Sequence, residues 1–450
     1  MKLDYKHNIF LIGIGGIGMS GLAKYFIKKN KNVFGYDREK SILSNDLTKI
    51  GAEIDYDLEN IEMKYNFLSK DNTIVIYTSA ILSDHVLLSY FQDNDFSIYK
   101  RADVLGDISK KSKCIAIAGT HGKTTTTSIL AHILKSADIS FTAFVGGIME
   151  NYNSNFIYNG EEYILAEADE FDKSFLKLNP DFACITSLDI DHLDIYKNKE
   201  GLHEAFDSFV NNMKLDGLLI SHENLHFNTL KYGEKNESDF RITNIKYKKG
   251  LSIFDFEYNS LNIKNIKLPL TGFHNVLNAT AAIALALEIR VHKNEIIDAL
   301  NNFTGVKRRF SYQIDNKNII YIDDYAHHPE EINNVFDSLK NIYPNDKLLV
   351  VFQPHLYSRT RDLVNEFAQS LSQFDAVILL EIYPAREIAI EGVSSSWLLE
   401  KIKCDNKMIS IKSDISNYIK KIGYKVNITL GAGDIANEVE HIKKDLEYAI

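Results

Sequence analysis

Residues 114–130 read CIAIAGTHGKTTTTSIL, and this stretch decides the fold of the chain. The apolar run at residues 114–118 is typical of a buried parallel strand, and residues 125–134 can continue as a helix. A glycine-rich turn between a strand and a helix directs backbone N–H groups and the helix N-terminus at a phosphate. We therefore predict an α/β domain with a phosphate-binding loop formed by Gly119, Thr120, His121, Gly122, Lys123 and Thr124.

Two side chains of this loop carry the chemistry expected of a nucleotide site. Lys123 is placed to reach the β- and γ-phosphates, and Thr124 to offer a hydroxyl to Mg²⁺. The usual loop has four residues between its first glycine and Gly-Lys, whereas only two stand here, because position 117 is Ile. An ordinary strand-to-helix turn is the alternative, but the flanking strand and helix favour nucleotide binding.

Length and composition predict a soluble protein of several domains. At about 150 residues per domain, 450 residues suggest three. The formal net charge of −10 argues against a nucleic-acid surface, and no apolar run approaches the roughly 18 residues of a membrane span. Cys114, Cys184 and Cys404 form no CxxC pair, and two of them lie in apolar runs, which indicates buried thiols of a reducing compartment. We expect a cytoplasmic protein that binds neither nucleic acid nor membrane.

The N-terminal segment matches a second phosphate-binding pattern. A strand at residues 8–12, the sequence GIGGIG at 13–18, a helix at 19–30 and a strand ending in Asp37 form a dinucleotide-binding fingerprint. Asp37 is then placed to accept a ribose hydroxyl. Alone, the pattern favours NAD, but a UDP-sugar also presents a diphosphate and a ribose, so both remain open. Another strand, at residues 72–80, runs into small residues at the edge where such sheets bind ligands.

Acidic residues follow two strands of the central segment. Residues 163–166 lead into EADEFD at 167–172, and four carboxylates at a strand end need cations or water around them. A solvated acidic turn is one reading, and a Mg²⁺ site that accompanies the nucleotide is the other. The strand at 182–188 leads to His192, which stands among three aspartates and therefore has a candidate metal or phosphate role.

Polar residues also flank a helix expected at residues 279–289. His274, Asn275 and Asn278 precede it at a spacing that places them on one side. Asn275 can cap the helix, or the group can recognise a nucleobase and ribose. The basic turn that contains Arg309 can hold phosphate or carboxylate.

The C-terminal segment alternates strands and helices again. Strands are expected at residues 318–322, 348–353, 376–382 and 426–430, and each is followed by polar residues, as in an open α/β sheet with its ligand site at the strand ends. With a polar linker at residues 109–113, we place domain boundaries at 1–107, 108–312 and 313–450.

Six motifs in order, together with the shortened loop, resemble the Mur ligases of bacterial peptidoglycan synthesis over essentially the whole chain. They are GIGGIGMSGLA at 13–23, AEADEFD at 166–172, DHLDIY at 191–196, GFHNVLNA at 272–279, DDYAHHPEEI at 323–332 and FQPHLYSRTRD at 352–362. Within the family, the combination is most similar to the branch that adds L-alanine. The branches that add later amino acids carry a modified lysine beyond DHLD, and residues 206–210 hold no lysine.

The resemblance implies an ATP-dependent ligase that joins L-alanine to the lactyl carboxylate of UDP-N-acetylmuramate through an acyl-phosphate. It implies a Rossmann-like first domain that binds the UDP-sugar, a P-loop ATPase-like second domain that binds ATP and Mg²⁺, and a Rossmann-like third domain that binds the amino acid. The UDP-sugar residues would be Gly15, Gly16, Ile17, Gly18, Asp37, Ser79 and Ala80. Residues 119–124 and Thr125, with Asn275, Asn278 and Arg309, would bind ATP, and Thr124, Glu167 and His192 the metal.

For the third domain, the resemblance assigns the amino acid to Tyr325, His327 and Arg359, and it makes Lys123, His192, His327 and Arg359 catalytic. Many alanine-adding enzymes have Arg where Leu356 stands, which leaves Arg359 or Arg361 for the alanine carboxylate. A ligase that recycles a tripeptide onto the same UDP-sugar is the nearest alternative. An NAD-linked oxidoreductase and a non-catalytic nucleotide switch are the others. We expect a monomer or weak homodimer.

Overall fold

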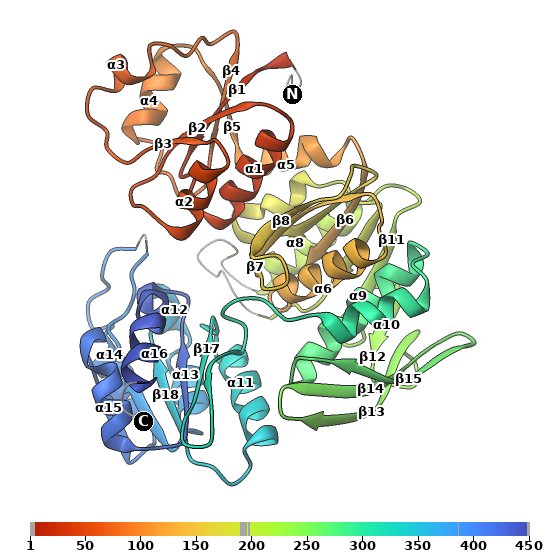
Figure 1. The fold of residues 1–450 in the computed structure, drawn as a ribbon, viewed down its shortest axis with the longest axis vertical. Helices are drawn as coiled ribbons and strands as arrows, with labels where there is room; N and C mark the ends of the chain where they lie inside the picture. The colour runs from red at the N-terminus through yellow and green to blue at the C-terminus, as the bar shows by residue number, and fades with distance from the viewer. Residues whose placement is uncertain (1–4, 190–195, 197–198, 386, 448–450) are drawn as a thin grey trace. The chain divides into compact units, whose positions relative to one another are not determined.

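The computed structural model describes residues 5–189, 196, 199–385 and 387–447, and its strands form three separate sheets (Figure 1). The first sheet has five parallel strands in the order β3-β2-β1-β4-β5. Its strands are β1 (Asn8–Ile12), β2 (Asn32–Tyr36), β3 (Glu53–Asp55), β4 (Thr73–Tyr77) and β5 (Ser97–Lys100). Its helices are α1 (Ile17–Lys28), α2 (Ile42–Lys49), α3 (Ile61–Tyr65), α4 (Val86–Asp93) and α5 (Arg101–Ser109).

Alternate residues of β1 explain why helices cover both faces of this sheet. Ile9 and Leu11 are buried in one apolar cluster, and Phe10 and Ile12 in another. A parallel strand that is apolar at every position must be covered on both sides. The doubly wound arrangement therefore follows from the composition of the strand.

The second sheet has ten strands in the order β15-β14-β13-β12-β11-β10-β6-β9-β7-β8. They are β6 (Lys113–Ala118), β7 (Phe141–Met149), β8 (Ser154–Tyr158), β9 (Tyr163–Ala168), β10 (Phe182–Ile185), β11 (Leu218–His222), β12 (Leu230–Gly233), β13 (Phe240–Lys248), β14 (Leu251–Tyr258) and β15 (Leu261–Leu268). The helices that accompany them are α6 (Lys123–Ser136), the 3₁₀ helix η2 (Phe171–Lys177), α8 (Lys199–Asn211), α9 (Phe273–Glu288) and α10 (Lys293–Asn302).

Strand register aligns the ends of three central strands. β6 lies between β9 and β10 and is parallel to both, with Ala118 opposite Ala168 and Ile185. The segments that follow these three residues therefore leave the sheet at one edge. This register places the phosphate loop beside the acidic run and beside the start of the segment that leads to His192.

The third sheet has six strands in the order β16-β17-β21-β18-β19-β20, parallel except for the edge strand β16. They are β16 (Ser311–Asp315), β17 (Ile320–Asp324), β18 (Leu348–Phe352), β19 (Ala376–Leu379), β20 (Asn406–Ile409) and β21 (Val426–Leu430). The helices are α11 (Pro329–Ile342), α12 (Tyr357–Asp362), α13 (Val364–Leu371), α14 (Ser395–Lys401), α15 (Ile415–Ile422) and α16 (Val439–Glu447), with 3₁₀ turns η3 (Lys412–Asp414) and η4 (Asp434–Glu438).

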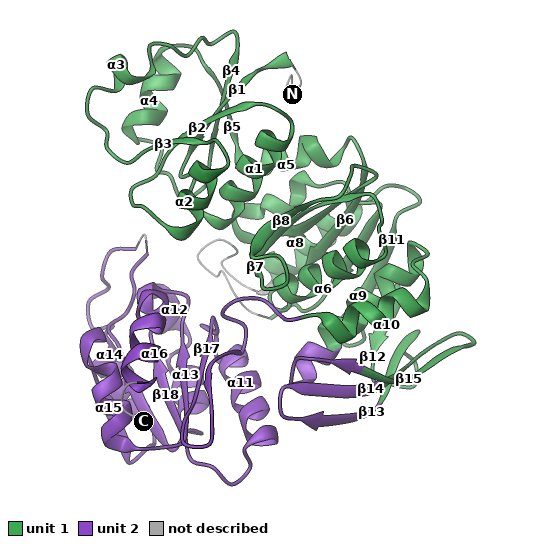
Figure 2. Ribbon diagram, viewed as in Figure 1, with its two compact units in different colours: residues 1–243, 255–266, 277–303 green, residues 244–254, 267–276, 304–450 purple. Residues whose placement is uncertain are grey.

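The chain divides into two compact units (Figure 2). One contains residues 1–243, 255–266 and 277–303, and the other contains residues 244–254, 267–276 and 304–450. The first sheet and strands β6 to β12 lie in the first unit, whereas β13, β14 and β15 are divided between the two units. One apolar cluster of the first unit runs from Ile9, Leu22 and Val104 to Phe144 and Phe175. The expected boundary at 107 falls inside α5, and only residues 110–112 separate that helix from β6.

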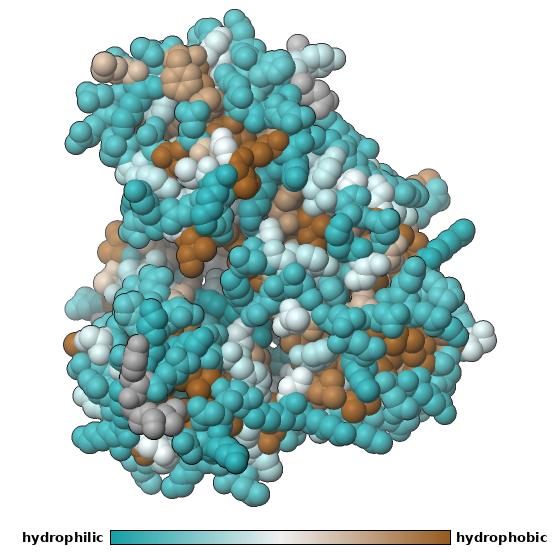
Figure 3. Space-filling model, viewed as in Figure 1, coloured by the Kyte–Doolittle hydropathy of each residue, from teal (hydrophilic) through white to brown (hydrophobic). Residues whose placement is uncertain are grey.

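The polarity of the surface (Figure 3) and the burial of two cysteines are as the sequence predicts. Hydrophilic residues cover most of the face drawn in Figure 3, and apolar residues form separate patches there. Cys114 and Cys184 are buried free thiols, as predicted. Within the described ranges, every helix is too short or too polar to cross a membrane.

Candidate active site

The phosphate loop is shaped by two glycines with positive φ. Gly119 has φ +129°, and a Cβ there would stand 2.1 Å from Oγ1 of Thr186. Gly122 has φ +83°, and a Cβ there would stand 2.4 Å from Oδ1 of Asn278. Helix α6 begins directly after Gly122, with neither a side-chain cap nor an acidic residue in its first turn. Its first N–H groups are therefore left for a ligand, and the helix dipole favours an anion.

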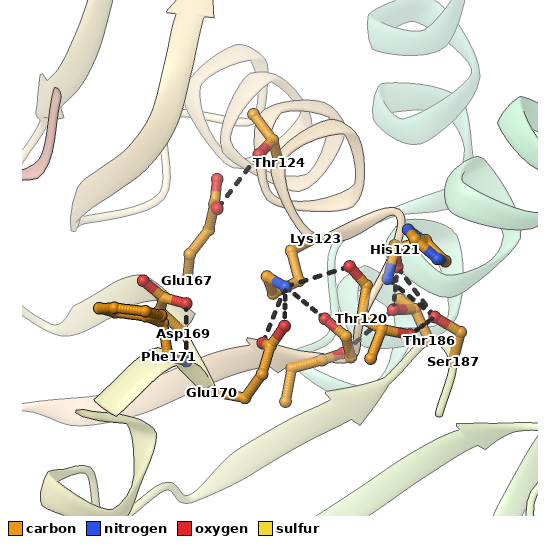
Figure 4. A network of polar contacts seen from close by, with 12 residues as sticks. Thr120, His121, Lys123, Thr124, Glu167, Asp169, Glu170, Phe171, Thr186 and Ser187 are labelled. Carbon is orange, nitrogen blue, oxygen red and sulfur yellow. Dashed lines mark hydrogen bonds and ion pairs between the residues drawn. The ribbon is translucent and has the colours of Figure 1, made fainter. Parts of the chain in front are cut away.

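Side chains at the end of β10 fix the middle of this loop (Figure 4). Ser187 Oγ lies 2.8 Å from Thr120 Oγ1 and accepts a hydrogen bond from the His121 N–H at 2.8 Å. The Asp189 N–H donates to Thr120 Oγ1 at 2.9 Å. These hydrogen bonds define the conformation of the loop.

Lys123 is held at the bottom of the loop by oxygen atoms (Figure 4). Its Nζ donates to both carboxylate oxygens of Glu170, at 2.9 and 2.8 Å, and to the carbonyl of Thr120 at 3.3 Å. Only 1% of the Glu170 side chain is exposed, so this ion pair is screened little by water. Burial alone would lower the pKa of Lys123, but the charges of Glu170 and Asp169 outweigh it and raise the pKa. Lys123 is therefore a fixed cation at neutral pH.

Thr124 and Glu167 place two hard oxygen ligands side by side. The Thr124 hydroxyl donates to Glu167 at 3.1 Å, and the other Glu167 oxygen accepts the Gly146 N–H at 2.6 Å. Burial raises the pKa of Glu167, although the Gly146 N–H and the charge of Lys123 oppose that change. No three His, Cys, Asp or Glu side chains in the described part of the chain are grouped to hold a metal ion. The pair suits an ion such as Mg²⁺, which keeps several waters and takes further oxygens from phosphate.

A cavity of about 380 Å³ joins this loop to the glycine-rich turn of the first sheet. Gly16, Ile17 and Gly18 at the start of α1 line it, as do Ser79 and Ala80 after β4. On the central side, Lys123, Glu167 and Asp169 line it, together with Phe144, Gly146 and Phe171. Residues expected from two separate motifs therefore open into one space, where two phosphate-bearing ligands can lie close together.

Gly15 and Asp37 lie behind the glycine-rich turn rather than on the cavity wall. The Gly15 N–H donates to Asp37 Oδ2 at 2.7 Å, and a Cβ on Gly15 would stand 2.9 Å from that oxygen. Asp37 thus already supports the turn through one oxygen. The other carboxylate oxygen of Asp37 is left for the ribose hydroxyl, and that contact stays a prediction.

In the second unit, residues around β17 and α11 form a cluster of charged and aromatic side chains. Arg309 stacks over the Tyr325 ring, with its guanidinium 5.2 Å from the ring centre, and lies 3.7 Å from Glu331. His327 Nδ1 lies 3.0 Å from the Tyr325 carbonyl oxygen and 3.2 Å from Glu331. Because a carbonyl can only accept, Nδ1 carries the proton in the neutral ring, and Nε2 is then the basic nitrogen.

Arg359 reaches the same cluster through His355. Its Nη1 lies 3.4 Å from His355 Nδ1, and the His355 and His327 rings are 6.0 Å apart. Leu356, which precedes α12, is buried and has φ +74°, a backbone conformation that a leucine rarely adopts. Tyr325, His327 and Arg359, predicted from separate strand ends, are thus neighbours.

Comparison with known proteins agrees with this arrangement. Three family models match in turn: the Mur ligase family catalytic domain at residues 8–113, the Mur ligase middle domain at 117–286, and the Mur ligase glutamate ligase domain at 308–434. A relative from Flavobacterium psychrophilum, UDP-N-acetylmuramate–L-alanine ligase, is 47% identical over 447 residues, which cover 99% of this chain and 100% of the relative. This chain belongs to the Mur ligase family.

Two solved structures resemble this Mur ligase over nearly its whole length. The UDP-N-acetylmuramate–alanine ligase of Thermotoga maritima has a TM-score of 0.82 and 27% identity, and covers 98% of this chain and 100% of its own. A murein peptide ligase of Psychrobacter arcticus has a TM-score of 0.70 at 23% identity, covering 98% of each chain, which is a likeness of fold. The predicted family and the predicted three-domain α/β fold are confirmed.

The structure also differs from several expectations for this Mur ligase. Helix α9 begins at Phe273 rather than at 279, and Asn275 does not cap it. Instead, the Asn275 side chain donates to the Thr271 carbonyl at 2.8 Å. Asn278 lies against Gly122 and accepts a hydrogen bond from Thr126 at 3.3 Å, so it belongs to the loop itself. His192 lies outside the described residues, and its expected metal role stays a prediction.

The sequence motifs did not identify three residues in or beside the cavity. Arg101 lines the cavity and lies close to Gly18, where a Cβ would be 3.1 Å from its guanidinium. Gly146 binds Glu167 through its backbone, and Glu170, seen only as part of the acidic run, is the partner of Lys123. The position of Arg101 directly after a parallel strand was the one available signal. A backbone contact such as that of Gly146 leaves no signal in the sequence.

The buried carboxyl group of Asp324, in the motif DDYAHH, should make the stability of this Mur ligase depend on pH. Burial raises its pKa to about 6, although its oxygens accept the N–H groups of Phe310 and Ala326. Between the pKa of an unfolded Asp and this value, the unfolded chain ionises while the folded chain stays protonated. The free energy of unfolding should therefore fall by up to about 3 kcal/mol as pH rises from 4 to 7.

The variant Asp324→Asn isolates this effect because asparagine does not titrate. Any hydrogen bond that Asn makes poorly lowers stability equally at every pH. Urea unfolding, followed by fluorescence of the single tryptophan Trp397 on α14, reports on the same domain. We expect the stability of Asp324→Asn relative to the native chain to improve between pH 4 and pH 7. A constant difference across this range would contradict the assignment.

Proposed function

We propose that this chain is an ATP-dependent ligase that joins L-alanine to the lactyl carboxylate of UDP-N-acetylmuramate. The observation that carries the proposal is the cavity in which the glycine-rich turn of the first sheet and Lys123 of the phosphate loop both open. The 47% identity with a relative of that name supports the choice of substrates.

The chemical problem is the activation of a carboxylate. A carboxylate does not react with an amine at neutral pH, because the leaving group would be a poor one. Transfer of the γ-phosphoryl group of ATP to the lactyl carboxylate gives an acyl-phosphate, from which phosphate leaves readily. The amine then attacks the acyl carbon, and the amide, ADP and phosphate are released. The first step brings two anions together, and the second develops negative charge on the acyl oxygen, so fixed cations and N–H dipoles favour both.

The first unit would bind both phosphorylated substrates. The N-terminus of α1, with Gly16, Ile17 and Gly18, is proposed to hold the diphosphate of the sugar nucleotide, supported by the guanidinium of Arg101. The N–H groups at the start of α6 would hold the ATP phosphates. Lys123, charged at neutral pH, would neutralise the γ-phosphoryl group as it moves between two oxygens.

Thr124 and Glu167 are the described residues that fit Mg²⁺, with His192 as the further ligand expected from the motif. A divalent cation bound there would neutralise phosphate charge and stabilise the charge that develops during transfer. The N–H of Gly146 orients one oxygen of Glu167 and leaves the other beside Thr124.

For the second unit, we propose that Tyr325, His327 and Arg359 bind L-alanine. The guanidinium of Arg359 suits the carboxylate of an amino acid, and the residue is only 8% exposed, so the pairing would be screened little by water. His327, whose Nδ1–H donates to the Tyr325 carbonyl, offers Nε2 to take a proton from the ammonium group. Arg309 and Asn275 are proposed to contact the nucleotide.

Phosphate release from ATP tests the proposal directly. The purified chain would be incubated with ATP, Mg²⁺ and UDP-N-acetylmuramate, and with L-alanine, other amino acids or a tripeptide. We expect release that depends on the sugar nucleotide and on L-alanine, with a product heavier by one alanine residue. Release that requires the tripeptide would assign the recycling reaction instead. Release that needs neither acceptor would indicate a nucleotide switch.

A further inference from the structure

The hairpin β7–β8 of the second sheet is attached to the first helix of the chain through one buried side chain. Asn155 on β8 has no exposed surface. Its Nδ2 donates to the Ile17 carbonyl at 2.6 Å and to Ser20 Oγ at 2.9 Å, and its Oδ1 accepts from Lys24 Nζ at 2.8 Å. Every polar group of Asn155 is thus engaged by the first two turns of α1.

Apolar side chains of α1 and the hairpin pack around Asn155. Gly21 of α1 faces the hairpin, and a Cβ there would stand 3.5 Å from the Phe144 ring and 3.7 Å from Asn155. Phe144 also packs on Phe156 and Tyr25, with ring centres 5.4 and 5.8 Å apart. Because a buried amide without partners is costly, Asn155 fixes which part of α1 meets the hairpin.

The same hairpin holds the proposed metal ligand from its other strand. The ladder between β7 and β8 is irregular between Phe144 and Met149, and Gly146 lies in that irregular stretch. Its N–H therefore points to Glu167 rather than to β8. A Cβ at Gly146 would stand 2.5 Å from Glu167 Oε2, so a larger residue there would displace the Glu167 carboxylate.

One hairpin thus contacts both halves of the cavity. Through Asn155, it holds Ile17, which follows the glycine-rich turn and lines the cavity. Through Gly146, it holds Glu167, which binds the Thr124 hydroxyl at the start of α6. Phe144 and Gly146 themselves line the wall between these points. The hairpin therefore links the helix that follows the glycine-rich turn to the carboxylate beside the start of α6.

We propose that Asn155 is a positioning residue, which keeps the sugar-nucleotide turn at the distance from Glu167 and the phosphate loop that phosphoryl transfer requires. This inference rests on the proposed function. Asn155 faces α1 rather than the cavity, so it acts through α1. Reactants must come within about 3 to 3.5 Å in line, and a displacement of about 1 Å can lower the rate about 100-fold. The expected signature is slower turnover with nearly unchanged binding of each nucleotide.

The variant Asn155→Leu, similar in size and without hydrogen-bonding groups, tests this. We expect kcat for alanine-dependent phosphate release to fall about 10- to 100-fold. The dissociation constants of ATP and of UDP-N-acetylmuramate, each measured alone by calorimetry, should change less than about threefold. Lys24→Met removes the hydrogen bond to Asn155 Oδ1 and a second one to Ser154 Oγ, and it should lower kcat about two- to fivefold. This variant is the test if Asn155→Leu does not fold.

Lys29→Met is the matched control. Lys29 lies just beyond the last turn of α1 and pairs with Glu161, so it also joins α1 to the second sheet, but far along the helix from the glycine-rich turn. We expect its kcat to stay within twofold of the native value. A folded Asn155→Leu with native kcat, or Lys24→Met with native kcat if the first variant does not fold, would overturn the inference. The inference would also be overturned if Asn155→Leu bound ATP and UDP-N-acetylmuramate much more weakly and was also less thermally stable. Failure of the native chain to use L-alanine would instead reject the proposed function.

Discussion

Replacing Lys123 by methionine is expected to lower kcat for alanine-dependent phosphate release by about 10³-fold. Methionine keeps the length of the side chain and removes its charge. Loss of one preorganised donor to developing charge costs about 10²–10³-fold in other enzymes, and here the lost donor is also a cation. The raised pKa of Lys123 means that this cation is present throughout the neutral range.

The same substitution should have a second effect, through Glu170, the ion-pair partner of Lys123. Glu170 is 1% exposed, and without Lys123 it becomes a buried carboxylate that has lost its cation beside the phosphate loop. ATP should then bind more weakly because a fixed negative charge faces its phosphates. The double variant Lys123→Met/Glu170→Gln should recover ATP affinity but not kcat.

Calorimetric titration with ATP and steady-state kinetics separate these two effects. Lys135→Met, in the last turn of the same helix, is the control and should retain native kcat. If Lys123→Met kept more than a tenth of native kcat, the assignment of Lys123 to the transferred phosphoryl group would be wrong.

Substitution of Glu167 by glutamine is expected to reduce kcat about 100-fold and to raise the Mg²⁺ concentration needed for half-maximal activity at least tenfold. Glutamine has nearly the same shape, so it can keep one hydrogen bond from Gly146 or Thr124. It lacks the negative charge that a hard cation prefers, and its NH₂ group must face a donor. The loss should therefore appear mainly as a weaker response to Mg²⁺.

A Mg²⁺ titration at fixed, saturating ATP measures this shift. Glu162→Gln removes the same charge from the residue just before β9, where 54% of the side chain is accessible, and should leave the Mg²⁺ curve unchanged. Equal Mg²⁺ curves for Glu167→Gln and the native chain would remove Glu167 from the metal site.

Local patterns were enough to predict the elements that form the phosphate site. The apolar run at 114–118 and the spacing of Gly119 and Gly122 are short-range features, and the structure has strand β6 and the loop there. Helix α6 begins at Lys123 rather than at 125, because the glycine at 122 itself ends the turn. The common edge of β6, β9 and β10 followed from the rule that parallel sheets gather ligand residues at their carboxyl ends.

Long-range contacts could not be predicted in the same way. The bond from Gly146 to Glu167 depends on an irregular ladder, and the bonds of Asn155 depend on how two sheets pack. Neither residue belongs to a recognisable pattern. The expectation that Asn275 caps the helix failed for a related reason. Its side chain is suitable for a cap, but it is buried beside Thr271 and donates to the Thr271 carbonyl instead.

The continuous apolar cluster of the first unit limits how this chain can exchange its parts with other ligases. Val104 and Phe26 on one side of the linker share that cluster with Phe144 and Phe175 on the other. A first domain grafted from a relative with a different acceptor would meet a foreign hairpin surface, and its α1 would lack a matched partner for Asn155. Exchange of the first two domains as a pair would keep both the apolar cluster and the hydrogen bonds of Asn155.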